Sequence, residues 1–223
     1  MRRRDSAAVA LLVALLVGCG GEVTDTSVPV IAGDGAATPI DAVHELVDAM
    51  SVPDFADASR LAMPGHAALA ALAEGASFSE VAAALRDGDA EIAANFWTGF
   101  AQETGSFLSG DIEVVDGETI TREGIDFHSV VVTPASGVSR EVIVRDEDGY
   151  RVDLFASFGA GLADRMSGQV ERLLVTQTDD ARLIMASLRG IVPSLLAAAQ
   201  LPGTPPEVSQ ELLALVEVIT RVG

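Results

Sequence analysis

Residues 142–152 read VIVRDEDGYRV, and this stretch decides the fold class. Asp148 and Gly149 both tolerate a positive φ, so the pair predicts a two-residue hairpin turn. The flanking segments, residues 138–145 and 150–155, are short and rich in branched and aromatic side chains. This composition is typical of strands. We therefore expect two antiparallel strands joined at this turn.

The segment after the turn alternates in character. Tyr150, Val152 and Leu154 fall on one face of a strand, while Arg151 and Asp153 fall on the other. We expect the first face to pack on a core and the Arg–Asp face to lie in water. The same strand composition occurs upstream, in residues 112–115, 119–121 and 125–133. The sequence thus predicts an antiparallel sheet of four or five strands.

Helical periodicity precedes this sheet. Thr38, Pro39 and Asp41 form a helix-start signal in front of an apolar stripe, and Pro53 ends that helix. Ser77 and Glu80 match a capping box. The further helices that we expect before the sheet cover residues 64–74, 77–88 and 90–103.

Apolar stripes at helical spacing return after Gly161. Thr178 or Asp179 is expected to cap a long helix that Gly190 and Pro193 kink or divide. The predicted class is therefore α+β. N-terminal helices pack on a curved antiparallel sheet within residues 38–160, and a helical C-terminal extension, residues 161–223, packs on that domain.

The N-terminus carries an export signal. Three arginines at positions 2–4 precede an apolar run over residues 7–17, too short for a membrane-spanning helix. The run ends in Leu-Val-Gly-Cys, which resembles the lipobox of bacterial lipoproteins, and Cys19 is the only cysteine of the chain. An ordinary secretory signal with a chance cysteine and a permanent membrane anchor are the alternatives.

The lipobox resemblance implies cleavage between Gly18 and Cys19 and attachment of acyl chains such as palmitate to Cys19. Residues 1–18 would then be a lipoprotein signal peptide, and residues 19–37 the lipidated cysteine with a flexible tether. The mature chain would sit on the extracytoplasmic side of a cell membrane, in the periplasm or at the cell surface.

The charge of the chain excludes some partners. The formal net charge is −19, and removing three arginines and one aspartate with residues 1–18 changes it to −21. Nucleic acids and anionic lipid headgroups attract basic surfaces, so the acidic composition argues against both as partners. A solvated acidic surface is the simplest interpretation, and a docking surface for a basic partner or for cations is the alternative.

The hairpin also carries a family resemblance. Its acidic–Gly–aromatic–basic–aliphatic order, Asp148 to Val152, resembles the last hairpin of NTF2-like lipoproteins, which usually have tryptophan where this chain has Tyr150. The resemblance covers residues 38–158 at most and implies a cone of helices over a strongly curved sheet. The helical tail after residue 161 departs from the family pattern.

Motifs for catalysis and metal binding are weak or missing. His44, Glu45 and Asp48 approach a zinc-peptidase helix, but aspartate stands where the second histidine is required. We interpret these side chains as the wet face of the first helix and His66 as a surface residue. Residues 146–149 lack the twelve-residue spacing of a calcium loop, and no GxSxG, P-loop or GxGxxG occurs. The sequence predicts no catalytic residue, no metal site and no cofactor.

Four residues are candidates for a ligand pocket: Trp97, Phe100, His128 and Tyr150. Core packing is the alternative for the aromatic cluster at residues 96–100, and an ordinary strand position is the alternative for His128. We predict a non-enzymatic lipoprotein that binds a small apolar ligand or a cell-envelope protein.

Two other functions stay open. One is an NTF2-like enzyme, in which His128 meets Asp126 or Asp153 inside the cone. The other is an assembly module that docks a partner through its apolar C-terminal helices.

Overall fold

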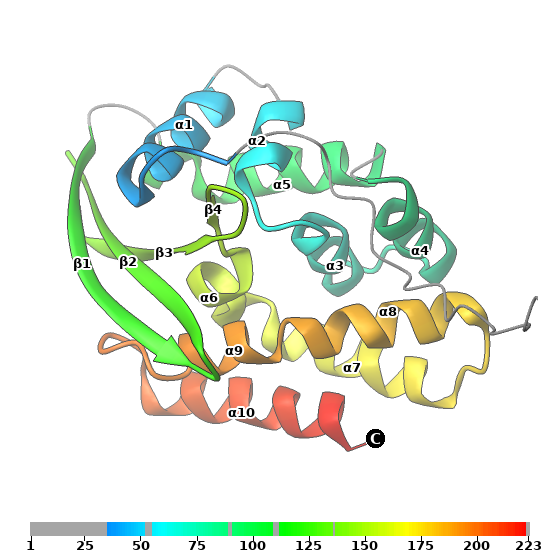
Figure 1. The fold of residues 1–223 in the computed structure, drawn as a ribbon. Helices are drawn as coiled ribbons and strands as arrows, with labels where there is room; N and C mark the ends of the chain where they lie inside the picture. Colours follow the sequence, from blue (N-terminus) through cyan, green and yellow to red (C-terminus); the bar gives the residue numbers. More distant parts are fainter. Residues whose placement is uncertain (1–34, 52–54, 89–90, 109–111, 136, 222–223) are drawn as a thin grey trace, which may run out of the picture.

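The computed structural model describes residues 35–51, 55–88, 91–108, 112–135 and 137–221 (Figure 1). Gly18, Cys19 and most of the expected tether lie outside these residues. The described chain is of the α+β class, as expected, with one antiparallel sheet and helices on both of its faces.

The sheet is an open antiparallel meander in the order β1-β2-β3-β4. Its strands are β1 (Ile112–Arg122), β2 (Ile125–Pro134), β3 (Arg140–Asp146) and β4 (Tyr150–Val152). The two segments expected at residues 112–115 and 119–121 are one strand, β1, whose pairing with β2 shifts register between Asp116 and Thr119. Beyond β4, the sheet edge is extended by single bridges from Ala36 and Ala62.

The positive φ values that the sequence predicts for the turn between β3 and β4 are confirmed. Asp148 has a φ of 52° and Gly149 a φ of 99°. The loop contains three residues, not two, because Asp146 pairs with Tyr150. A β-carbon on Gly149 would lie 2.7 Å from the Cα of Gly35, so the N-terminal segment needs a glycine at this position.

The two faces of the sheet pack on different helices. On one face, α1 (Pro39–Ser51) lies against all four strands, over a layer of valines: Val130, Val132, Val142, Val144 and Val152. On the other face, Phe127 and Ile143 pack with Ala156 of α6 (Leu154–Phe158) and Ala197 of α9 (Val192–Ala198). Successive side chains of β2 and β3 therefore point alternately into two apolar layers, one on each face of the sheet.

The remaining N-terminal helices are α2 (Phe55–Leu61), α3 (His66–Ala73), α4 (Phe78–Asp87) and α5 (Glu91–Leu108). The sequence interpretation missed α2 and ended α5 too early. The capping box at Ser77 and Glu80 is confirmed, and so is the cap of α1, where Thr38 Oγ1 accepts from the backbone N–H of Asp41.

The chain after α6 continues through the short turn η1 (Gly159–Gly161), α7 (Ala163–Val175), α8 (Asp179–Gly190), α9 and α10 (Pro206–Thr220). Thr178 caps α8 through the N–H of Ala181. The apolar residues of these helices, such as Leu188, Leu195 and Leu212, are fully buried and share one core with α1 to α5.

Gly190 and Pro193 divide the expected long helix into α8 and α9, which meet at a bend of 42°. Among the described residues, no single helix combines the length and the hydropathy that a bilayer crossing requires, although α8 and α9 together do.

The expectation for residues 151–155 was wrong. The strand ends at Val152, and Leu154–Phe158 is helix α6. Arg151 and Asp153 are 2% and 0% exposed instead of facing water. Alternation assigns side chains to faces only within a strand. Here Asp153 ends the strand and caps a helix that turns back under the sheet.

Candidate ligand pocket and buried ionic cluster

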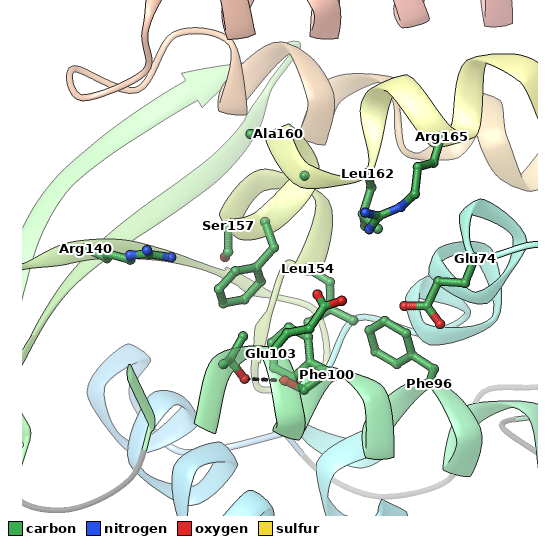
Figure 2. Close-up of a pocket in the computed structure, with 13 residues that line it drawn as sticks. Glu74, Phe96, Phe100, Glu103, Arg140, Leu154, Ser157, Ala160, Leu162 and Arg165 are labelled. Atoms are coloured by element: carbon green, nitrogen blue, oxygen red, sulfur yellow. Dashed lines mark hydrogen bonds between the residues drawn. The ribbon is translucent and has the colours of Figure 1, made fainter. Parts of the chain in front are cut away.

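One pocket, with a volume of about 290 Å³, opens between α3, α5, α6 and the start of α7 (Figure 2). Its apolar floor consists of Phe96, Phe100, Leu154, Phe158 and Leu162. Phe96 and Phe100 are one helical turn apart on α5, and Leu154 and Phe158 are one turn apart on α6. This i, i+4 spacing puts each pair on one helix face, so two amphipathic faces form the floor.

The aromatic side chains of the floor contact one another. Phe100 lies with its ring centroid 5.6 Å from Phe96 and 5.0 Å from Phe158, the latter edge to face. Trp97 packs edge to face behind both α5 phenylalanines, at 5.0 and 5.5 Å. Such edge-to-face contacts hold aromatic rings in place, so the apolar floor of the pocket is preformed in the absence of a ligand.

The rim of the pocket is charged. Figure 2 shows Glu74, Glu103 and Arg165 reaching into the opening from the end of α3, from α5 and from α7. Partial burial and the neighbouring Glu103 raise the pKa of Glu74, while Arg165 opposes that rise. Within the described residues, none of these three side chains makes an ion pair or a hydrogen bond.

Ser157 also lines the pocket, but its hydroxyl is already engaged. Ser157 Oγ accepts from the N–H of Ile143 at 2.8 Å and donates to the backbone oxygen of Asp153 at 2.7 Å. The side chain thereby ties α6 to β3. Within the described residues its hydroxyl makes hydrogen bonds to backbone groups only, and none to a side chain that could act as a base. It therefore has the geometry of a structural serine and not of a nucleophile.

A buried ionic cluster lies behind the pocket, centred on Asp153. Its Oδ1 accepts from the N–H groups of Phe155 and Ala156 at 3.1 and 2.9 Å, and its Oδ2 accepts from Ser194 Oγ at 2.6 Å. Arg145 Nη1 lies 3.5 Å from Oδ2, and His66 Nδ1 lies 3.6 Å from Oδ1. One carboxylate thus connects β3, α3, α6 and α9.

His66 is neutral at physiological pH. Burial lowers its pKa from 6.5 to about 4; Arg145 adds to this effect and Asp153 opposes it. The ring packs edge to face on Phe155 at 5.0 Å. Its other side lines a second cleft, of about 330 Å³, between α3, the β3–β4 loop and α8. The expectation that His66 is a surface residue was wrong, because only 4% of the residue is exposed.

The four pocket candidates from the sequence form two contacting pairs, Trp97 with Phe100 and His128 with Tyr150. Phe100 lines the first pocket. Trp97 is fully buried, and its Nε1 donates to Ser59 Oγ at 2.8 Å. His128 and Tyr150 contact each other edge to face at 5.6 Å on neighbouring parts of the sheet and line neither pocket described above.

The proposed pairing of His128 with an aspartate is also wrong. His128 Nδ1 lies 3.2 Å from Thr119 Oγ1, and Asp126 accepts from Thr121. Asp153 lies near His66 instead, with Oδ1 3.6 Å from Nδ1 and no hydrogen bond between them. His44 is exposed on α1, and no three His, Cys, Asp or Glu side chains gather as metal ligands anywhere in the described residues.

Sequence reasoning missed most of the pocket. Phe96 belongs to the aromatic cluster of the sequence, but Phe158 lies between the strand expected at residues 150–155 and the helices expected after Gly161, where no element is predicted. Glu74, Glu103 and Arg165 carry no local signal, because charged residues at helix ends are common on any solvated surface.

Comparison with known proteins returned no match: no protein-family model, no curated protein and no solved structure resembles this chain.

Proposed function

We propose that this protein is a membrane-anchored extracytoplasmic lipoprotein that binds a small ligand with an apolar part. The observation that carries the binding role is the pocket of about 290 Å³ floored by Phe96, Phe100 and Phe158. Pockets that bury small ligands have this character, mostly apolar with a few polar groups at the opening. The lipobox ending at Cys19 supports the anchoring role.

The anchoring half is tested by Cys19→Ala. The variant has no thiol for acylation, so it should leave the membrane fraction for a soluble or unprocessed form. Fractionation of cells followed by immunodetection measures this. A variant that is cleaved normally and still fractionates with membranes would contradict the lipoprotein proposal.

The binding half is tested by narrowing the pocket. Gly161 lines it, and a β-carbon there meets nothing within 4 Å. Gly161→Leu therefore adds bulk at the pocket wall without a clash in the fold. Gly168→Leu is the matched control, since Gly168 is also exposed, also unobstructed, and lies on α7 away from the pocket.

The readout is native mass spectrometry of the mature chain carrying Cys19→Ser, followed by solvent extraction. We expect a co-purified small molecule whose occupancy falls in Gly161→Leu and not in Gly168→Leu. Equal occupancy in both variants would place the ligand elsewhere. If the protein co-purifies with no ligand and also binds none of the added apolar probes, the proposed binding role is contradicted.

The proposal includes an NTF2-like relationship for residues 38–158. It is supported by α1 packed across all four strands of a meander and by the Asp148–Gly149 turn before Tyr150. Helices α6 and α9 cover the opposite face of the sheet, which a simple cone leaves open.

The enzymatic alternative keeps one supporting observation, the Asp153–His66 pair beside the second cleft. A base with a pKa of about 4 is weak at neutral pH, and three donors already occupy Asp153. We therefore rank it below ligand binding. The assembly-module alternative is weaker still, because the apolar stripes of α7 to α10 are buried within this chain.

A further inference from the structure

The rim of the pocket carries both signs of charge over an apolar floor. Glu74 and Glu103 are carboxylates, and Arg165 and Arg140 are guanidiniums. Arg140, on β3, already has an interaction within the chain, whereas Glu74, Glu103 and Arg165 are exposed at the opening. Within the described residues these three side chains make no hydrogen bond or ion pair, so their charges are available to a ligand at the opening.

The two carboxylates and the Arg165 guanidinium line the same opening. Partial burial and Glu103 raise the pKa of Glu74, and Arg165 opposes that rise, as expected for charges around one pocket. Figure 2 places Glu74 and Glu103 around Phe96 and places Arg165 on the α7 side, next to Leu162. The two carboxylates therefore come from the α3 and α5 side of the opening, while Arg165 lies on the α7 side and Arg140 on the β3 side.

From this arrangement we infer that the ligand is a small zwitterion with an apolar substituent, of the kind represented by a hydrophobic amino acid. Its ammonium group lies between Glu74 and Glu103, its acidic group faces Arg165, and its apolar group rests on Phe96, Phe100 and Phe158. This inference rests on the proposed ligand-binding function and names the ligand class for the same pocket.

A simple apolar ligand would leave the rim without partners, and a purely cationic or anionic one would meet one side of the rim with like charge. Only a ligand with both charges close together complements both sides. The size of the pocket, about 290 Å³, suits a single amino acid with a large side chain and excludes a folded peptide.

Four probes that share one benzene ring separate the contributions: phenylalanine, phenethylamine, phenylpropanoate and ethylbenzene. The second lacks the carboxylate, the third lacks the ammonium, and the fourth lacks both. Trp97 is the chain's single tryptophan and contacts Phe96 and Phe100, so its fluorescence reports binding at the floor. The protein is the mature chain with Cys19→Ser, and calorimetry confirms each affinity.

We expect phenylalanine to bind about fivefold tighter than either singly charged probe, the upper range for a solvent-exposed ion pair. In the double variant Glu74→Gln with Glu103→Gln, the preference for phenylalanine over phenylpropanoate should vanish. In Arg165→Met, the preference over phenethylamine should vanish instead. Glu171→Gln on α7, exposed and outside the pocket, controls for net charge and should change neither ratio.

The possible results distinguish a failure of the zwitterion inference from a failure of the proposed ligand-binding function. Equal binding of all four probes would overturn the zwitterion and leave the apolar pocket standing. An affinity for phenylalanine that is the same in the unmodified protein and in the rim variants would also overturn the zwitterion inference. Failure of every probe, ethylbenzene included, would overturn the zwitterion and the pocket together.

Discussion

Asp153 brings a negative charge into an interior that excludes water, and its surroundings explain how the charge is tolerated. Burying a carboxylate is costly unless hydrogen bonds and a counter-charge replace its hydration. Here two backbone N–H groups, the Ser194 hydroxyl and Arg145 supply them. The residue serves as a cap and as a connection between elements that are far apart in the sequence.

Asp153→Asn separates these two roles. Asparagine still accepts from the N–H groups of α6, as a good cap does, but it leaves Arg145 without its counter-charge. Breaking a buried ion pair in this way should lower the free energy of unfolding by about 3 kcal/mol. Urea denaturation measures it. Asp126→Asn, at an exposed strand position, is the control and should cost less than about 0.5 kcal/mol; similar costs in both would show that the buried charge is unimportant.

His66 makes stability depend on pH. Its pKa is about 4 in the folded protein and 6.5 when unperturbed. Between those values the unfolded chain binds a proton that the folded chain does not, so stability falls as the pH drops through this window and is complete above it. The full difference is on the order of 3 kcal/mol. Asp153 and Arg145 are the charged groups that face the ring.

The measurement is the unfolding free energy at several pH values between 4 and 7, in the unmodified chain and in His66→Gln. The variant should have the flatter curve, because glutamine takes up no proton in this range. His44→Gln changes an exposed histidine and should reproduce the unmodified curve. Parallel curves for all three chains would mean that His66 titrates in the folded protein as it does in water.

At the scale of elements, the β3–β4 hairpin organises the N-terminal half. Its turn holds Gly149 at a positive φ and in contact with the backbone of Gly35, and Ala36 pairs with Tyr150. The turn between β1 and β2 has a similar glycine, Gly124 at a φ of 79°, with nothing within 4 Å of its missing β-carbon. The two turns therefore share a glycine at positive φ but differ in the packing around it.

Gly124→Ala and Gly149→Ala make use of that difference. Both place a β-carbon at a positive φ, which costs about 1 kcal/mol. Gly149→Ala must also displace the segment at Gly35, so its total cost should be about 2–3 kcal/mol. Thermal melts followed by circular dichroism compare them. Equal melting temperatures for the two variants would show that the contact with Gly35 adds nothing to stability.

At the scale of the whole molecule, the C-terminal helices complete a core that begins with α1. Phe127 and Ile143 would lose their cover without α6 and α9, and the floor of the pocket would lose Phe158 and Leu162. The apolar stripe of α8 is enclosed on both sides, by α4 and by α7. The pocket is therefore a product of the packing between the two halves of the chain.

Leu188→Asp tests this packing, because Leu188 is fully buried on α8. An unpaired carboxylate there should unfold the protein or produce an aggregating state, at a cost of about 3 kcal/mol or more. Leu213→Asp is the matched control, on a face of α10 where the leucine is 45% exposed. Size-exclusion chromatography with melting curves distinguishes them. A monomeric Leu188→Asp that melts cooperatively at the unmodified temperature would contradict the shared core.

The sequence by itself determined the local features: the helix starts at Thr38, Ser77 and Thr178, the division of α8 from α9, and the turn at Asp148 and Gly149. These depend on hydrogen bonds and φ preferences within a few residues, so a short window contains their cause. The α+β class followed from the same windows.

Tertiary structure alone decided where residues 151–158 and His66 lie, and it decided the pocket. Asp153 could be buried only because Arg145 of β3 and Ser194 of α9, which is 41 residues further along the chain, meet it there. Phe158 became part of the pocket because α6 turns back to meet α5. The burial of a residue depends on the side chains that pack on it and not on its neighbours in the sequence. The site could therefore not be predicted from the sequence without the tertiary structure.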